Sequence, residues 1–409
     1  VQTESVIYVC QRYESLMGLF YLLSLYCFLR GCTTALHPRR WHDGALAACL
    51  LGMGAKGVMM TAPVMILLYD HVFLAGSSFG AVRSRWKVHA ALLISVGATL
   101  CLGLLYREYD AGAYAEPARV AAYLLTQCRV VLYYLRLAVF PYPLCLDYGW
   151  RTVQSLREVV LPAGVLVFLI GASLRALWRR QPAGYLGTWF FVILAPTSSF
   201  FPIDDVISEH RMYLPSAGLV LLAVLGGYHS LDVCRVRGAA SFGWRKGAAA
   251  TAAVLIVVFA GLTMMRNLDY RSERRLWGDV VRHQPDNLRA RNDLAVAFCE
   301  EGRLEEAQVH FDYVLSKTEG VGNWAAVAGE IPDGIIADNS PRFNRCRAFA
   351  NMGVTASIQG RADLAVSNFV AALSIYPYSE DVGIKLRHAV LKGGIPPEKV
   401  DEEIRRLLR

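Results

Sequence analysis

Residues 247–276 read GAAATAAVLIVVFAGLTMMRNLDYRSERRL, and the change of character at Arg266 decides the fold. Residues 247–265 carry no charge and approach the roughly 20 apolar residues that a membrane-spanning helix needs. From Arg266 onward charged residues are dense. A chain that changes in this way has one part built for a membrane and another built for water.

The remainder of the N-terminal part repeats the apolar pattern. The chain of 409 residues is 55% hydrophobic, above the roughly 45–50% of soluble domains, and its mean hydropathy is +0.33. Single crossings are predicted at residues 15–30, 88–106, 160–178, 185–203 and 212–230.

Two further apolar stretches do not fit a single crossing. Residues 44–73 are interrupted by GMGAKG, which predicts a tight hairpin with Lys56 at its tip. Residues 121–140 carry Arg129 and Arg136 and are interpreted as a re-entrant or interfacial helix. The predicted fold class is therefore all-α, beginning with a polytopic transmembrane helical bundle.

The formal net charge of +8 comes largely from short loops between apolar runs. Such a bias marks cytoplasmic loops, and it assigns residues 31–43, 76–87, 175–182 and 231–246 to that side. The opposite side then receives residues 1–14, Lys56, residues 107–158, residues 196–211 and everything after Arg266. No basic-aromatic module accompanies the charge, so nucleic acid is not an expected partner. The ten cysteines include no CxxC pair, which gives no support to a zinc or redox site.

Small and aromatic residues recur in the charged C-terminal part. Both units share alanines and a phenylalanine at matching positions: Leu294, Ala295, Phe298, Ala307, Phe311 and Val314 in one, and Met352, Gly353, Ala356, Ala365, Phe369, Ala372 and Pro377 in the other. This pattern is typical of the tetratricopeptide repeat of ~34 residues. The predicted domains are 1–266 in the membrane and a short α-solenoid at 267–409. Repeats lie near 287–320 and 343–377, with an insertion at 320–342.

Polar side chains cluster in three places on the predicted non-cytoplasmic side. The first contains Glu4, Arg12 and Glu14, the second is Lys56, and the third is the run 196–216. The charged and neighbouring polar residues of this third cluster are Asp204, Asp205, Glu209, His210, Arg211 and Tyr213. Ionisable groups at membrane depth are costly, which makes them candidates for function. Arginine and lysine suit a phosphate, and carboxylates suit general-base chemistry. The structural alternative pairs Arg12 with Glu14 or Glu4, and Arg211 with Glu209.

Four segments together carry a resemblance to a known family. They are QTESVIYVCQRYESLMGLFYLL, the hairpin ending in LLYD, VVLYYLRLAVFP with LDYGW, and APTSSFFPIDDVISEHRMYLPSAG. They resemble bacterial relatives of the transmembrane and tetratricopeptide-repeat O-mannosyltransferases, in the C-type glycosyltransferase superfamily. The resemblance covers nearly the whole chain, and EHRMYLPS at 209–216 is its most specific part.

The resemblance implies a polytopic enzyme that transfers a sugar from a polyprenyl-phosphate donor on the extracytoplasmic face. Lys56 and Arg211 would then face the donor phosphate, with Tyr213 beside them, and Glu4 and Arg12 would border the sugar. Glu14, Glu209 and His210 would support the site. Enzymes of this kind carry an essential acid in a loop that would precede Val1. Glu4, Asp204 or Asp205 is the expected substitute within this sequence.

The leading hypothesis is a membrane glycosyltransferase whose repeats present an acceptor protein or peptide. Its partners would be membrane lipid and the lipid-linked sugar, and its location a bacterial inner membrane with the repeats in the periplasm. No cofactor is indicated, no metal site is predicted, and dependence on a divalent metal stays open. One alternative is an O-antigen-type ligase or polymerase, although the segment comparable to its large basic periplasmic loop is short and mixed in charge here. Another is a non-catalytic repeat scaffold anchored in the membrane.

Overall fold

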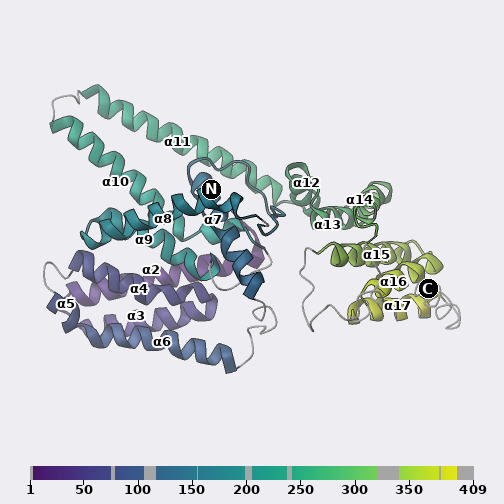
Figure 1. Cartoon of the computed structure of the whole chain (residues 1–409), viewed down its shortest axis with the longest axis horizontal. Coiled ribbons are helices and arrows are strands. Elements are labelled where there is room, and N and C mark those ends of the chain that lie inside the picture. Colours follow the sequence, from purple (N-terminus) through teal and green to yellow (C-terminus); the bar gives the residue numbers. More distant parts are fainter. Residues whose placement is uncertain are drawn as a thin grey trace. The chain divides into compact units, whose positions relative to one another are not determined.

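The computed structural model describes residues 3–74, 79–105, 117–153, 155–198, 205–236, 242–320, 340–376 and 379–393. The chain forms two compact units. The first comprises Val1–Leu144 and Trp150–Leu268, and the second comprises Cys145–Gly149 and Asp269–Arg409. Within the described residues every regular element is a helix (Figure 1).

The first unit is a bundle of helices joined by short 3₁₀ and π-helical turns. Its elements are α1 (Glu4–Ile7), η1 (Val9–Gln11), α2 (Arg12–Thr33), α3 (Pro38–Ala55), η2 (Gly57–Thr61), α4 (Ala62–Tyr69), η3 (Asp70–Leu74), α5 (Phe79–Ser84), α6 (Trp86–Leu105), α7 (Pro117–Val139), α8 (Arg157–Trp178), α9 (Pro182–Leu194), η5 (Ala195–Ser198), η6 (Glu209–Met212), α10 (Pro215–Val236) and α11 (Phe242–Asp269).

The core of this bundle lies between α2, α3, α4 and α9. Tyr21 and Phe28 of α2 are buried there, and Trp189 of α9 packs edge-on against Tyr21 at 5.3 Å between ring centroids. A small residue brings α9 against α8: a Cβ on Gly187 would lie 2.4 Å from the hydroxyl of Ser173. Close packing of this kind fixes the neighbouring helices with few voids.

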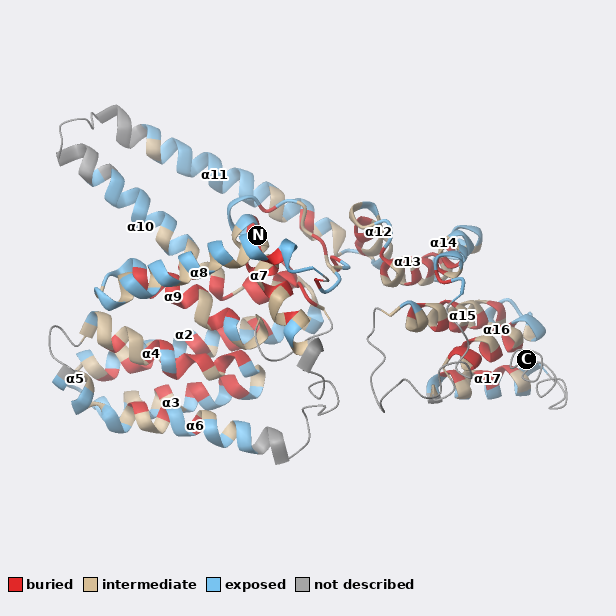
Figure 2. Ribbon diagram, viewed as in Figure 1, coloured by how far each residue is buried: buried red, intermediate tan, exposed pale blue. Residues whose placement is uncertain are grey.

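The outer helices expose apolar side chains to their surroundings. Figure 2 shows α8, α10 and α11 mostly exposed, whereas α2, α4 and α9 contribute much of the buried core. In the described part of the chain, four helical stretches are long and apolar enough to cross a membrane: Val9–Thr33, Gly57–Leu74, Arg157–Trp178 and Gly247–Asp269. A helix that is apolar yet exposed needs an apolar solvent. The fold class expected from the sequence, an all-α membrane bundle followed by helical repeats, is confirmed.

The chain breaks at Lys56, as the glycine-rich interruption predicted. α3 ends at Ala55, and Lys56 has an extended backbone with φ −160° and ψ 139° before η2 begins. The arms on either side pack mainly against α2 and α6. The segment 121–140 forms most of the regular helix α7, and its re-entrant or interfacial placement stays a prediction.

The second unit is built from helical hairpins. Its elements are α12 (Glu273–His283), α13 (Leu288–Glu300), α14 (Leu304–Lys317), α15 (Pro341–Ile358), α16 (Ala362–Ile375) and α17 (Glu380–Gly393). α13 packs against α14 and α15 packs against α16, and these two pairs coincide with the two predicted repeats. Residues 321–339, most of the expected insertion, lie outside the described residues, as does Pro377.

Small residues let the paired repeat helices approach each other. Ala295, Ala307 and Phe311 are buried in the first hairpin. In the second hairpin, a Cβ on Gly353 would lie 2.7 Å from the ring of Phe369. Each aromatic side chain therefore fills a space that the facing small residue leaves open.

The second unit also contains a short segment taken from the chain between α7 and α8. Within Cys145–Gly149, Tyr148 is buried, and Asp147 lies 4.0 Å from the guanidinium of Arg289. Gly149 has φ +58° and sits against the side chain of Asn287, the residue that caps α13. That residues 145–149 belong to the second unit was not predicted from the sequence.

Candidate functional site

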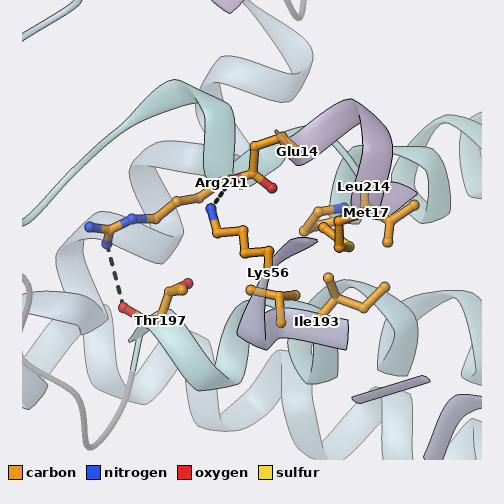
Figure 3. A pocket seen from close by; sticks show the side chains of 9 residues that line it. Glu14, Met17, Lys56, Ile193, Thr197, Arg211 and Leu214 are labelled. Atoms are coloured by element: carbon orange, nitrogen blue, oxygen red, sulfur yellow. Dashed lines mark hydrogen bonds and ion pairs between the residues drawn. The ribbon is translucent and has the colours of Figure 1, made fainter. Parts of the chain in front are cut away.

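A narrow pocket in the first unit brings together side chains from distant parts of the sequence. It is lined by Glu14, Met17, Lys56, Val58, Ile193, Thr197, Arg211, Leu214 and Pro215. Figure 3 shows the ammonium group of Lys56 directed at Glu14, whereas the guanidinium of Arg211 points away from Lys56 toward the carbonyl of Thr197. Lys56 and Arg211, which the family resemblance places at the donor phosphate, are thus both among the residues that line this pocket.

Lys56 is held by a buried carboxylate. Its ammonium group donates to Glu14, in the first turn of α2, and lies 4.9 Å from the centre of the Tyr13 ring. Glu14 is nearly inaccessible, so its charge needs a close cation. The glycine-rich break after Ala55 is what brings Lys56 level with the start of α2.

A second carboxylate lies beside this pair. Oε1 of Glu4 is 2.7 Å from Nδ1 of His210, and Oε2 accepts from the backbone N–H of His210 at 3.0 Å. The other ring nitrogen, Nε2 of His210, is 4.0 Å from Glu14. Glu4, His210, Glu14 and Lys56 thus form a continuous polar chain with one edge on the pocket.

The guanidinium of Arg211 is buried in a cage of oxygen acceptors. It donates to the carbonyls of Thr197, Val206 and Asp205, at 3.4 and 3.3 Å for the first two. It also lies 3.4 Å from the hydroxyl of Tyr123. These bonds keep the arginine charge beside the pocket at a depth where a free charge is costly.

Helix α7 supports the polar segment that carries Arg211. Tyr123 donates to the carbonyl of Thr197 at 2.6 Å, Gln127 to that of Val206 at 2.9 Å, and Tyr134 to that of Ser208 at 2.9 Å. Sequence reasoning missed these three residues. Their spacing of four and seven places them on one helical face, and this was the available signal.

Apart from Lys56, Arg211 and Glu14, the predicted site residues that the structure describes do not line this pocket. The ring of Tyr213 packs against α2, 3.0 Å from where a Cβ on Gly18 would stand. Arg12 is exposed at the start of α2, while Glu4 and Glu14 bind His210 and Lys56 instead. Asp205 contributes its carbonyl to Arg211, and Glu209 is buried. Asp204 lies outside the described residues.

The pocket has a volume of only about 10 Å³, close to what a single water molecule requires. Any larger ligand must displace the side chains that now fill it. Among the described residues, no three His, Cys, Asp or Glu side chains come together as a metal-binding group. The ionisable groups at the pocket are therefore the cations Lys56 and Arg211 and the carboxylate of Glu14. Glu4 and His210 form a hydrogen-bonded pair next to them.

Comparison with known proteins finds sequence similarity to several O-mannosyl-transferases. The chain is similar to Protein O-mannosyl-transferase Tmtc3 of Drosophila melanogaster, at 27% identity over 262 residues, covering 58% of this chain and 27% of the relative. It is similar to Protein O-mannosyl-transferase F38B6.6 of Caenorhabditis elegans at 24% identity, covering 76% of this chain and 43% of the relative. With Protein O-mannosyl-transferase TMTC4 of Mus musculus the identity is 23%, covering 75% and 46%.

The chain spans less than half the length of each of these relatives. No family model matches it. No solved structure matches it either.

Proposed function

We propose that the chain is a membrane glycosyltransferase of the TMTC O-mannosyl-transferase kind. It would move a sugar from a polyprenyl-phosphate donor to a protein hydroxyl on the extracytoplasmic face. The observation that carries the proposal is that Lys56 and Arg211 line one pocket with the carboxylate of Glu14. The printed names of the relatives support the sugar-transfer chemistry.

The donor phosphate would exchange places with ligands that the protein now supplies. Lys56 leaves Glu14 and binds a phosphate oxygen, and Arg211 turns part of its guanidinium from backbone carbonyls to the same group. Arginine offers paired donors in a fixed geometry, and lysine acts as a point charge, so the two complement each other on one phosphate.

Release from Lys56 gives Glu14 a second role. The acceptor oxygen attacks the anomeric carbon, the bond from that carbon to the phosphate oxygen breaks, and polyprenyl phosphate leaves. The hydroxyl proton passes to Glu14, the carboxylate among the described lining residues. Both cations then stabilise the charge on the leaving phosphate, an electrostatic role suited to a dry site. Glu4 orients His210 beside this step.

The repeats would present the acceptor on the same side of the membrane as the pocket. Stacked helical hairpins offer a concave surface suited to extended peptides. The bacterial inner membrane and the periplasmic position of the repeats stay predictions of the sequence.

Donor binding is the first test. The purified chain in lipid nanodiscs is titrated with radiolabelled polyprenyl-phosphate mannose. Loss of a charge-assisted bond predicts binding about tenfold weaker for Arg211→Ala, with Arg211→Lys in between. Arg179→Ala, at the exposed end of α8, is the matched control and should bind as the wild type does.

Transfer to a serine- or threonine-containing protein is the second test. Glu14→Gln should keep donor binding and lose transfer, because it removes the proton acceptor and leaves both cations. Melting curves verify that each variant is folded. Wild-type protein that does not bind the donor, or Arg211→Ala that binds it normally, would overturn the proposal. Binding without transfer would reject the enzyme, and transfer of a whole glycan would favour a ligase.

A further inference from the structure

A second, larger pocket opens on the outside of the first unit, between α7 and the start of α8. It is lined by Arg129, Trp150, Arg151, Thr152, Val153 and Glu158, and its volume is about 380 Å³. It shares no lining residue with the pocket at Lys56 and Arg211. The proposed transferase function makes no use of it.

The interior of this second pocket is arranged around one aromatic ring. Arg129 lies over Trp150 at 5.5 Å and forms an ion pair with Glu158 at 2.5 Å. Tyr133 meets the same tryptophan edge-on at 5.0 Å. The charge of Arg129 is thus already neutralised by Glu158. The charge of Arg151 therefore determines which ligand charge the pocket favours. Within the described chain Arg151 is exposed and has no hydrogen-bond or ion-pair partner.

An apolar groove begins two residues further along α8, at Val160. Val160, Leu161, Gly164, Val165 and Phe168 line it, and its volume is about 410 Å³. Leu161 and Val165 follow Glu158 at i+3 and i+7, the spacing that places side chains on one helical face. Gly164 hollows the groove, because nothing lies within 4 Å of where its Cβ would stand. The polar pocket and the apolar groove therefore succeed each other along one side of α8.

This side of α8 faces away from the protein. Only 6% of the apolar 18-residue window within the candidate span Arg157–Trp178 is buried, and Figure 2 shows α8 largely exposed. Tryptophan and tyrosine gather where a membrane meets water, and Trp150, in contact with Tyr133, comes shortly before the candidate span Arg157–Trp178. A ligand that fits must have a polar, anionic end and a long apolar end.

We propose that this surface binds an anionic phospholipid of the bilayer. The phosphodiester lies between Arg151 and Arg129 against the edge of Trp150, and one acyl chain runs along the groove past Gly164 to Phe168. The unpaired charge of Arg151 selects an anionic headgroup over a zwitterionic one. The site is separate from the donor pocket, so the proposal stands whether or not the transferase function does.

Native mass spectrometry of the detergent-solubilised chain tests the site with phosphatidylglycerol and phosphatidylcholine of identical acyl chains. We expect phosphatidylglycerol to bind more tightly, and Arg151→Gln to weaken it about tenfold through the lost charge-assisted bond. The matched control is Arg157→Gln, which removes an exposed arginine of α8 that lies outside the pocket. It should bind as the wild type does.

A second variant tests the groove rather than the charge. Gly164→Leu fills the hollow, so it should weaken both lipids while leaving the preference between them unchanged. Equal losses for Arg151→Gln and Arg157→Gln would show non-specific attraction and overturn the proposal. Equal binding of the two lipids, normal binding by Gly164→Leu, or preferential capture of polyprenyl phosphate would do the same.

Discussion

The ammonium group of Lys56, just after α3, forms an ion pair with the carboxylate of Glu14, in the first turn of α2. Their side chains are 17% and 3% exposed. Taking two charges out of water costs free energy that their attraction only partly restores. Removing one partner costs more, because the other is left buried without a counter-charge.

Replacing Lys56 with methionine should therefore destabilise the protein. Lys56→Met leaves Glu14 unpaired, and the expected loss is about 3 kcal/mol, at the lower end for buried pairs because Lys56 keeps some exposure. The double variant Lys56→Met/Glu14→Gln should recover most of it. Thermal melting in detergent measures all three proteins. Arg12, the first residue of α2, is exposed, so Arg12→Met is the control and should melt like the wild type. A loss equal to that of Lys56→Met would contradict the pairing.

The next prediction concerns the hydroxyl of Tyr134, which holds the backbone of Ser208. It donates to the carbonyl of Ser208 and accepts from the N–H of the same residue, both at 2.9 Å. Tyr134→Phe leaves two buried backbone groups without this partner, at a cost of about 1–3 kcal/mol. Because the segment also carries Arg211, donor binding should weaken as well. Tyr228→Phe, on the exposed side of α10, should change neither; unaltered donor binding in Tyr134→Phe would show that α7 does not position the pocket.

Gly353 in the second repeat tests the small-aromatic packing. A Cβ there would stand 2.7–3.0 Å from ring atoms of Phe369. Gly353→Ala should destabilise the repeat by about 1–3 kcal/mol through overpacking, and adding Phe369→Leu should relieve part of it. Gly383 lies in helix α17 with open space around its Cβ position, so Gly383→Ala should stabilise by about 0.5–1 kcal/mol. Chemical denaturation followed by circular dichroism distinguishes these opposite signs.

Gly149 separates a backbone effect from a packing effect. Its φ of +58° disfavours any residue with a Cβ by about 1–2 kcal/mol. A Cβ would also stand 3.1 Å from the amide of Asn287. Gly302 has φ +75° with nothing near its Cβ position, so Gly302→Ala reports the backbone cost alone. In parallel thermal melts, Gly149→Ala should lower the stability more than Gly302→Ala does. Equal losses of stability would mean that the side chain of Asn287 moves aside without a measurable loss of free energy.

The sequence was sufficient to predict two parts of the fold: the helices that need an apolar environment, and the hairpins marked by a repeating pattern of small and aromatic residues. The uncharged run ending at Met265 identified an exposed membrane helix, and Ala295, Phe311 and Phe369 marked hairpin cores that are buried as expected. These signals are local. The break at Lys56 could also be predicted, because several nearby glycines weaken a helix, and α3 ends at Ala55.

The partners of each charge could not be predicted in the same way. Sequence proximity suggested Arg12 for Glu14, yet the fold brings Lys56 to it from another helix. Arg211 is held by carbonyls and by Tyr123 of α7, contacts that depend on the path of residues 205–208 rather than on residue type. The placement of residues 145–149 in the second unit likewise depends on tertiary contacts. Tertiary packing decides which charged side chains contact each other. Spacing along the sequence indicates only which side chains lie on the same face of one helix.

His310 in the first repeat gives a prediction on pH. Its ring stacks on Phe298 at 5.7 Å, and Nδ1 lies 3.4 Å from a guanidinium nitrogen of Arg291. Burial, aided by the positive charge of Arg291, lowers the pKa of His310 below its ordinary value of 6.5. The folded state therefore takes up a proton less readily than the unfolded state.

Below pH 6.5 the unfolded chain becomes protonated at this residue first, so stability falls with pH until the folded pKa is passed. Above pH 6.5 the contribution is fully present. Hydrogen exchange of α13 and α14 between pH 7.5 and 5 should show the local opening free energy falling with pH in the wild type, after correction for intrinsic exchange. His310→Phe keeps the stacking and should flatten this dependence, whereas His388→Phe, exposed on α17, should not; a slope unchanged in His310→Phe would assign it to another group.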